Sequence, residues 1–585
     1  PIKSSAASDV YKRQVLQWSV LPDETAKVQS AYRIQVTASG HLLWDTGWTE
    51  SAEQFVRYQG NALPVGERIE IEIRIKDQVG RESLPANDFF YFGQVADWKA
   101  AWIASSEDIH RKTVYFCNDF ILEREPEDAY LLICGLGYHK VFLNETPLDF
   151  SLLDPAYSDY TKTCYYAMIP ELASHLSKGR NTIRCAVGEG WRRLDSSFIQ
   201  KHLGMRRMRF EGTPQLSAIL FVKIEGTWSR CITTDSSWNW TSGPLVSNNL
   251  YDGIVYDARL PFSPQKQVRL VPAPGGKMCV QSLEPIRKKE AWRPLSVLLL
   301  RNDTYLVDFG QNTAGFAALR LPSHTESGQK ITVAYAELLN ENGDLFTEPL
   351  REAKATDTYI CSGEEAGKPI WEPDFTYHGF RYIRVSGYGE PLTAEDLTAY
   401  SIYTDIEKAQ NYFTCGSALV NQIHRNAVLC EKSNLHSIMT DCPQRDERMG
   451  WMNDATVRFE ATPFNFEIGR LFPKVIRDIL DVQDPDGSIT CTAPFVIGAR
   501  PADPVCSSFL IAGLEALLHT GNTEIIREAY EGFRAWEDCL LAHSEAYIVN
   551  YSYYGDWAAP AYACEGEDGA VSAVTPGILM STGYS

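Results

Sequence analysis

The chain has 585 residues, which at about 150 residues per domain predicts roughly four domains. Its apolar content of 44% is too high for a disordered chain, and no apolar stretch approaches the roughly 20 residues of a membrane-spanning helix. The formal net charge of −20 disfavours nucleic acids and anionic membranes as partners, because their phosphates require cationic surfaces. Neutral substrates remain open.

The 14 cysteines all follow residue 116 and include no CxxC pair. This spacing argues against a zinc site or a disulfide scaffold and predicts reduced, mostly buried thiols. Scattered cysteines without evident partners slightly favour the cytoplasm as the compartment. No nucleotide-binding or phosphate-binding glycine motif occurs, so no cofactor and no metal are expected.

The first 14 residues are excluded from the fold interpretation. Pro1 is not a start Met, and residues 9–14 resemble the translation of a sequencing-library transposon end. We expect residues 1–14 to be a non-native leader, so the start of the chain carries no information about secretion.

Residues 15–93 show the two-residue period of half-buried strands. Tyr32, Ile34 and Val36 would share one face, and isoleucines alternate with charged residues over residues 69–76. Turn sequences divide these strands at spacings that are typical of a small sandwich. We therefore predict a fibronectin III-like β-sandwich.

Residues 94–285 continue as strands, with an apolar run at 130–137 and a short strand at 141–143. A Pro and Gly cluster at 272–276, followed by the basic residues 287–289, predicts a linker to the next module.

Residues 292–405 form the third β-rich segment, and no long helix is expected before residue 410. Its predicted strands are 331–334, 358–361 and 380–385.

Helical spacing begins after residue 410. Leu419, Ile423, Ala427 and Cys430 recur on one helix face, and Leu435 and Ile438 continue this stripe. Four more helices are predicted at about 454–462, 466–482, 504–520 and 523–545. Repeated helical hairpins indicate an α/α bundle or toroid, which we expect to be incomplete in this chain.

The densest polar and aromatic cluster is DCPQRDERMGWMND at residues 441–454, between two predicted helices. Loops held by rigid helices commonly carry catalytic groups. The side chains that can converge there are Asp441, Arg445, Glu447, Trp451 and Asp454. They offer hydrogen-bond acceptors, a bidentate donor and a flat face for sugar C–H groups. The alternative is a solvated turn in which Asp454 caps a helix.

This string closely resembles the signature of bacterial α-L-rhamnosidases of glycoside hydrolase family 78, in which CPQRDER is followed by GW and D. Similar strings occur in matching order elsewhere: GLGY at 135–138, GEGW at 188–191, DFGQN at 308–312, ATDTY at 355–359 and YHGFRY at 377–382. The resemblance covers about residues 30–560.

The resemblance implies β-sandwich modules followed by an incomplete (α/α)6 toroid. The expected modules are a fibronectin III-like sandwich (15–93), a jelly roll similar to carbohydrate-binding domains (94–285), a β-sandwich (292–405) and the first half of the catalytic toroid (410–585). It further implies hydrolysis of terminal non-reducing α-L-rhamnose by an inverting acid/base mechanism.

By motif position, Glu447 would be the general acid, while Asp441, Arg445 and Asp454 would bind rhamnose hydroxyls. Trp451 would face the methyl-bearing edge of the sugar. Trp557, in the family-like string GDW at 555–557, would form a second wall, unless it is a core aromatic.

Two departures from the family pattern qualify this expectation. Residues 501–506 (PADPVC) lack a Trp that many relatives carry near the sugar, so the aglycone or sugar preference stays open. The family's general base is a Glu in later helices that no residue of this chain matches. We therefore expect the chain to be an inactive fragment.

The expected partners are rhamnose-containing glycosides or polysaccharides, and a homodimer is left open for the full-length protein. One alternative is an inverting glycosidase that acts on another sugar with the same toroid. The other alternative is a non-catalytic carbohydrate-binding protein.

Overall fold

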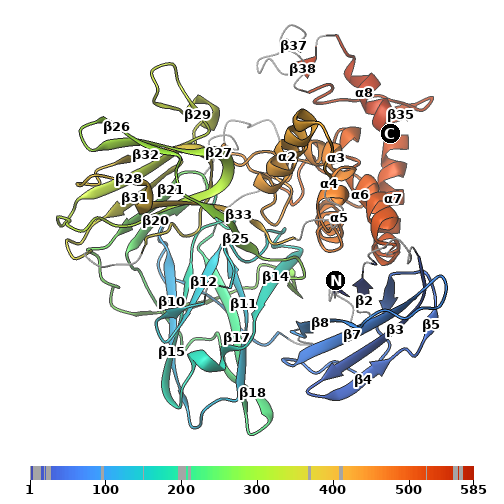
Figure 1. Ribbon diagram of the computed structural model, residues 1–585, viewed down its shortest axis with the longest axis horizontal. Helices are drawn as coiled ribbons and strands as arrows, with labels where there is room; N and C mark the ends of the chain where they lie inside the picture. The colour runs from blue at the N-terminus through green and yellow to red at the C-terminus, as the bar shows by residue number, and fades with distance from the viewer. Residues whose placement is uncertain are drawn as a thin grey trace.

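The computed structural model contains three β-rich modules followed by a group of helices (Figure 1). It describes residues 2–3, 15–18, 20, 28–93, 98–148, 150–194, 206–207, 212–365, 370–406, 413–521, 523–557, 564–565, 571–572 and 574–585. Within these ranges no helix has the length and apolar character needed to cross a membrane.

The N-terminal module is built from two small antiparallel sheets. One has the order β4-β3-β7-β8, with β5 beside β3, and the other has the order β1-β2-β6. The strands are β1 (Ile2–Lys3), β2 (Val15–Trp18), β3 (Gln29–Ala38), β4 (His41–Asp45), β5 (Thr49–Glu50), β6 (Phe55–Arg57), β7 (Arg68–Asp77) and β8 (Ala86–Tyr91). The predicted alternation is confirmed, because Ile34, Val36, Ile69 and Ile71 are all buried.

The second module consists of two larger sheets around one apolar core. The first sheet contains β10 (Val114–Leu122), β12 (His139–Leu143), β13 (Thr146–Pro147), β15 (Gly179–Val187), β19 (Asn239–Thr241) and β22 (Lys266–Gln267). The second contains β9 (Trp102–Ala104), β11 (Asp128–Leu136), β14 (Thr163–Ile169), β17 (Gln215–Ile224), β18 (Thr227–Thr233), β23 (Arg269–Val271) and β24 (Lys277–Val280). The strands predicted at 130–137 and 141–143 are therefore confirmed.

The third module is one nine-stranded sheet with the order β20-β21-β31-β28-β32-β27-β33-β25 and with β26 beside β27. The strands are β20 (Leu245–Asn249), β21 (Gly253–Asp257), β25 (Ile286–Trp292), β26 (Ser296–Arg301), β27 (Thr304–Leu319), β28 (Lys330–Ala336), β31 (Thr356–Ile360), β32 (His378–Ser386) and β33 (Leu397–Thr404). A short hairpin, β29 (Leu338–Leu339) and β30 (Leu345–Phe346), projects beyond the sheet.

Two details of the predicted boundary before this module are wrong. The basic residues 287–289 do not form a linker, because they lie in β25 and pair with β33. Strands β20 and β21, which we placed in the second module, belong to the third sheet because β21 pairs in parallel with β31. A parallel pairing between segments about a hundred residues apart leaves no local signal in the sequence.

The helices follow the third module and lie beside it (Figure 1). They are α2 (Ala418–Ser433), α3 (Met452–Phe459), α4 (Thr462–Asn465), α5 (Leu471–Val482), α6 (Ser508–Thr520), α7 (Glu524–Ala542) and α8 (Gly577–Tyr584). The predicted stop after Thr520 is confirmed, since Gly521 caps α6 in a left-handed conformation. The predicted extension of α2 to Ile438 is wrong, because the helix ends at Ser433 and Ile438 is buried in the following loop.

The apolar stripe of α2 faces outward. Leu419 and Ile423 are 71% and 60% exposed, whereas Glu431 and Lys432 on the last turn are buried. Lys432 donates to Glu290 of β25 at 2.6 Å, so polar contacts hold this end of the helix on the third module. Among the described residues, nothing covers the stripe.

The modules contact one another across long stretches of sequence. In the N-terminal module Arg57 pairs with Glu524 at the start of α7, so the first module lies against the helices (Figure 1). In α5, Lys474 donates to the backbone oxygen of Tyr157 at 2.9 Å, which ties the helices to the second module. The loop between α2 and α3 contacts the third module directly, through hydrogen bonds from Arg448 to backbone oxygens at positions 250 and 377.

Candidate active site

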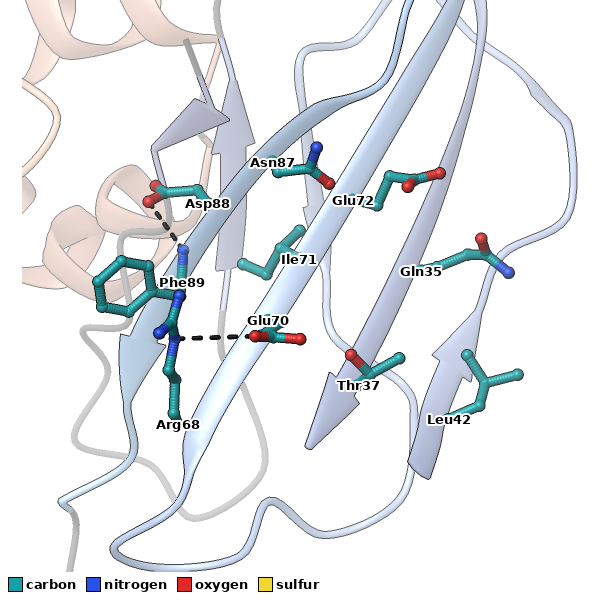
Figure 2. Close-up of a pocket in the computed structure, with 10 residues that line it drawn as sticks. All are labelled: Gln35, Thr37, Leu42, Arg68, Glu70, Ile71, Glu72, Asn87, Asp88 and Phe89. Atoms are coloured by element: carbon teal, nitrogen blue, oxygen red, sulfur yellow. Dashed lines mark hydrogen bonds and ion pairs between the residues drawn. The ribbon is translucent and has the colours of Figure 1, made fainter. Parts of the chain in front are cut away.

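A hollow of about 480 Å³ lies on the outer face of the N-terminal sheet (Figure 2). Arg68 covers the ring of Phe89 at 3.9 Å, and the side chain of Glu70 is 57% exposed. Catalytic acids and bases cluster where burial or neighbouring charges perturb their pKa. We therefore do not regard this sheet face as a candidate catalytic centre.

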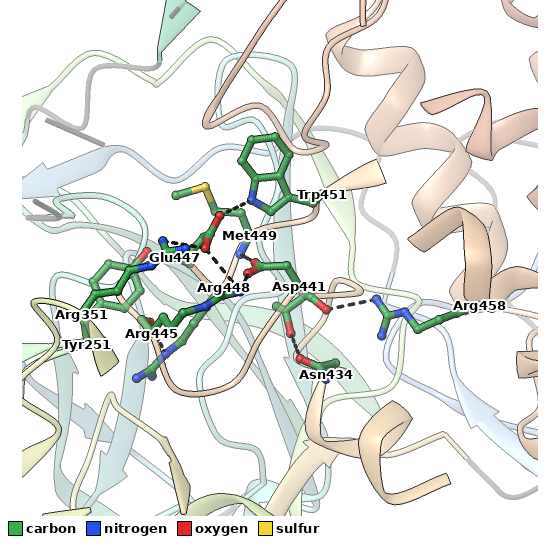
Figure 3. A network of polar contacts seen from close by, with 11 residues as sticks. Tyr251, Arg351, Asn434, Asp441, Arg445, Glu447, Arg448, Met449, Trp451 and Arg458 are labelled. Atoms are coloured by element: carbon green, nitrogen blue, oxygen red, sulfur yellow. Dashed lines mark hydrogen bonds and ion pairs between the residues drawn. The ribbon is translucent and has the colours of Figure 1, made fainter. Parts of the chain in front are cut away.

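The loop 441–451 is the candidate active site, and the buried side chain of Arg448 fixes its shape (Figure 3). The Arg448 guanidinium donates to the backbone oxygens of Leu250 at 2.9 Å and of Tyr377 at 2.5 Å. It also donates to two backbone oxygens within its own loop. These bonds attach the loop between the helices to the third module. Arg448 stands in the motif, but its role in fixing the loop is not among the sequence predictions.

Asp441 lies at the start of this loop with only 3% of its side chain exposed. Its Oδ1 accepts a hydrogen bond from the backbone N–H of Met449 at 2.8 Å, and its Oδ2 accepts one from Arg445 at 3.2 Å. Burial, and secondly the nearby charge of Glu447, raise the pKa of Asp441 to about 7. The loop therefore contains a carboxyl group that retains its proton far above the usual range.

Glu447 receives a donor on each carboxylate oxygen (Figure 3). The indole Nε1 of Trp451 donates to Oε1 at 2.9 Å, and Nη1 of Arg351 donates to Oε2 at 2.9 Å. The hydroxyl of Tyr251 donates to the backbone oxygen of Glu447 at 2.7 Å. Two of these three partners come from the third module, and sequence reasoning did not identify either of them.

Arg445 lies between the two acidic side chains. Its Nη2 is 3.2 Å from Asp441 Oδ2 and 3.6 Å from Glu447 Oε2. One ligand atom each from Asp441, Cys442 and Glu447 lie within 4.8 Å of one another, a spacing that would also suit a metal ion. Both carboxylates already have guanidinium partners, and burial raises the pKa of the Cys442 thiol, so these atoms are poor ligands as they stand.

Asp454 occupies the first turn of α3. The N-cap of this helix is Trp451, so the alternative in which Asp454 acts as the N-cap is wrong. Burial raises the pKa of Asp454, Arg458 opposes this shift, and the charge of Glu447 adds to it. Arg445 thus bridges Asp441 and Glu447 within the loop, and the charge of Glu447 acts on Asp454 of α3. Their roles toward a substrate stay predictions.

An aromatic row forms one side of this group. Trp451 contacts Tyr554 edge to face with ring centroids 5.9 Å apart, and Tyr554 contacts Trp557 in the same way at 5.6 Å. Trp557 is 43% exposed, so it is not a core aromatic. Asp503, in the segment that departs from the family pattern, accepts from the backbone N–H groups of Tyr553 and Tyr554. That segment therefore holds the backbone of the aromatic row in place through Asp503.

Ten of the thirteen cysteines in the described residues are buried, which agrees with the burial predicted for most of the thiols.

Four family models match the chain in order. They are described as a Rha78A-like N-terminal immunoglobulin domain (11–94), an α-L-rhamnosidase N-terminal domain (124–290), a bacterial α-L-rhamnosidase concanavalin-like domain (299–403) and a bacterial α-L-rhamnosidase six-hairpin glycosidase domain (408–583).

Similar proteins carry the same descriptions. An α-L-rhamnosidase of Formosa agariphila is 28% identical over 95% of this chain and 64% of its own length. The solved α-L-rhamnosidase of Dictyoglumus thermophilum is 30% identical with a TM-score of 0.87, covering all of this chain and 68% of the other. A Streptomyces avermitilis α-L-rhamnosidase solved with L-rhamnose has a TM-score of 0.85 at 21% identity, over 74% of its length. The chain spans 64% and 62% of the lengths of two curated α-L-rhamnosidases that it matches.

Proposed function

The chain belongs to the bacterial α-L-rhamnosidase family, and from this membership we propose that the protein hydrolyses terminal α-L-rhamnose residues from glycosides or polysaccharides. The observation that carries the proposal is the buried group around Glu447. A carboxyl group with a second acid, a guanidinium and an indole around it is the equipment expected for protonating a glycosidic oxygen.

In the proposed mechanism Glu447 is the general acid. It donates a proton to the glycosidic oxygen as the bond to rhamnose breaks, so the leaving group departs as a neutral alcohol. The neighbouring Asp441, with its pKa raised to about 7, keeps a proton within the same buried pair near neutral pH.

The spacing of this pair supports a separate role for Asp441. Carboxylates of an inverting pair stand roughly 6.5–9.5 Å apart to leave room for water. Oxygen atoms of Asp441 and Glu447 lie within 4.8 Å, which leaves no such room. We therefore propose that Asp441 binds a sugar hydroxyl, and we assign the general base of an inverting reaction to no described residue.

Substrate binding is proposed to use the remaining polar and aromatic groups. Asp441 and Asp454 would accept hydrogen bonds from rhamnose hydroxyls, and Arg445 would donate. Trp451 and Trp557 would cover the apolar edge of the ring, since flat aromatic faces suit sugar C–H groups. The exposed position of Trp557 beside Tyr554 supports its part in this wall.

The first test is Glu447→Gln in the full-length protein. Loss of the general acid should lower kcat on alkyl rhamnosides by about 10²–10⁴-fold, and should slow activated aryl rhamnosides less, because their leaving groups need no proton. Glu460→Gln, at an exposed carboxylate at the end of α3, is the matched control. Equal slowing of both substrate types by Glu447→Gln would contradict the assignment.

Turnover and binding assays on the same protein distinguish the competing functions. Turnover of an aryl fucoside or arabinoside in preference to the rhamnoside would favour a different sugar, and rhamnose binding without any turnover would favour a binding protein. The expected inactivity of residues 1–585 alone stays a prediction, which assays of this chain beside the full-length protein will check.

A further inference from the structure

One side chain of the candidate active site comes from a loop of the third module. The loop between β30 and β31, residues 347–355, carries Arg351, whose Nη1 lies 2.9 Å from Glu447 Oε2. The loop is anchored beside the site, because Leu350 and Ala353 are buried and the N–H of Ala355 donates to the backbone oxygen of Tyr251. Arg351 therefore reaches the general acid from a fixed base.

The backbone of Arg351 adopts a conformation that disfavours a side chain. Its φ is +56° and its ψ is −117°. Residues other than glycine seldom occupy this region, and when they do they cluster at functional sites. The strained position aims the guanidinium at Glu447.

Both oxygens of Glu447 accept from groups that can only donate, namely an indole and a guanidinium. A general acid must instead carry a proton, and a guanidinium bound to a carboxyl group favours the ionised form, so proton donation is easier when one donor moves away. Trp451 is buried at 8% exposure, whereas the side chain of Arg351 is 37% exposed. Arg351 is the partner that can leave.

The destination of the released guanidinium follows from the reaction proposed above. The glycosidic oxygen lies at Glu447 during proton transfer, so the leaving group occupies the space beside Glu447 into which Arg351 reaches. A guanidinium that loses one carboxylate is best satisfied by another, in a bidentate pair. The same loop carries Glu348 and Glu352 beside Arg351 and Lys354 and is neutral overall, so the preference proposed below depends on the Arg351 guanidinium itself.

We propose that Arg351 determines leaving-group specificity: on substrate binding its guanidinium exchanges Glu447 for a carboxylate on the leaving group. This inference rests on the proposed rhamnosidase activity and names the aglycone class as anionic.

The test compares 4-carboxyphenyl and 4-carbamoylphenyl α-L-rhamnosides, which differ in charge but barely in shape, on the full-length protein. The wild type should favour the carboxylate by about ten- to a hundredfold in kcat/KM, the range expected for one charged hydrogen-bonded pair. Arg351→Gly should bring this ratio close to one, and glycine accepts the positive φ, so the loop keeps its shape. Arg351→Lys should retain part of the preference.

Arg320→Ala is the matched control, because Arg320 is an exposed arginine of the same module, paired with Asp396. It should keep the wild-type ratio. Where a variant is too slow to assay, inhibition constants of the two uncleavable S-linked analogues give the same comparison.

A wild-type ratio near one, or a ratio that Arg351→Gly leaves unchanged, overturns the inference while the rhamnosidase proposal stands. Absence of any rhamnoside turnover by the wild type overturns the proposed function, and this inference with it.

Discussion

The carboxyl group of Asp441 combines deep burial with hydrogen bonds from Arg445, from the backbone of Met449 and from the Cys442 thiol. Removing a carboxylate from water favours its neutral form, and the nearby charge of Glu447 acts in the same direction. The site therefore stores a proton at the cost of folding stability at neutral pH.

This cost predicts a pH dependence. The pKa of Asp441 rises from 3.8 to about 7 on folding, so between these values the folded state binds more protons than the unfolded state. The free energy of unfolding should consequently fall as pH rises from about 4 to about 7. Asp441→Asn cannot titrate and should flatten this decline, as measured by the denaturation midpoint at several pH values. A decline as steep as in the wild type would contradict the shift.

The exposed Asp538→Asn serves as the control and should keep the full decline. Some decline should also persist in Asp441→Asn, because burial raises the pKa of Asp478 to about 7 as well.

Some residues of the candidate site could be predicted from the sequence and others could not. The motif predicted Asp441, Arg445, Glu447 and Trp451, because they stand within eleven positions of one another. Arg351 and Tyr251 were missed, since they lie 96 and 196 positions from Glu447 and are brought to it only by the packing of the third module. No local spacing encodes such a contact.

At the scale of elements, α5 joins the helices to the second module through a buried ion pair. Lys474 Nζ donates to Asp478 Oδ2 at 2.5 Å and to the backbone oxygen of Tyr157. Both side chains are nearly inaccessible to solvent. Asp481, one turn further, accepts from Thr163 of β14 at 2.7 Å. A helix with an otherwise apolar buried face thus uses charged groups at its contact with another module.

Removing one partner of this pair should be costly. Lys474→Met leaves the Asp478 carboxyl buried without its ammonium, which should destabilise the helical part by ~3–5 kcal/mol. The double variant Lys474→Met, Asp478→Leu should regain much of this loss. The measurement is the midpoint of chemical unfolding followed by circular dichroism at the helical band.

The control for this helix is Arg477→Met. Arg477 pairs with Glu528 at the surface, and the loss should stay within ~1 kcal/mol. A Lys474→Met effect no larger than that of Arg477→Met would show that the buried pair contributes little.

The elements themselves were largely predictable. Two-residue alternation located β3 and β7, and helical periodicity located α6 and α7, because these elements bury apolar residues at regular spacing. Periodicity also located α2, but its apolar stripe is exposed, so the pattern predicted the helix and not the face that is buried. The ends were less predictable: α5 begins at Leu471 and α6 at Ser508, a few positions after the expected starts. Strand pairing between distant segments, as for β21 and β31, follows from the fold and not from local pattern.

At the scale of the molecule, the helices present uncovered apolar side chains. Leu419 and Ile423 of α2 and Leu514 and Leu518 of α6 are each more than half exposed. Exposed apolar side chains of this kind promote association.

Purified residues 1–585 should therefore self-associate as concentration rises and should bind a hydrophobic dye. Leu419→Lys together with Ile423→Glu should reduce both effects, as followed by sedimentation velocity and dye fluorescence. Arg425→Glu, at an exposed polar position of the same helix, should not. A monomer that binds no dye at any concentration would refute the prediction.

The attachment of loop 441–451 to the third module has a consequence for how such proteins are divided. Arg448 binds backbone oxygens at positions 250 and 377, and Glu447 is held by Tyr251 and Arg351. A domain boundary drawn at residue 408 would separate the acid from all of these partners. The β modules and the helices therefore form one functional unit. Chimaeras that exchange the helices between relatives should keep activity only when the side chains at positions 251 and 351 are transferred with them, whereas positions 250 and 377 contribute backbone oxygens that any residue supplies.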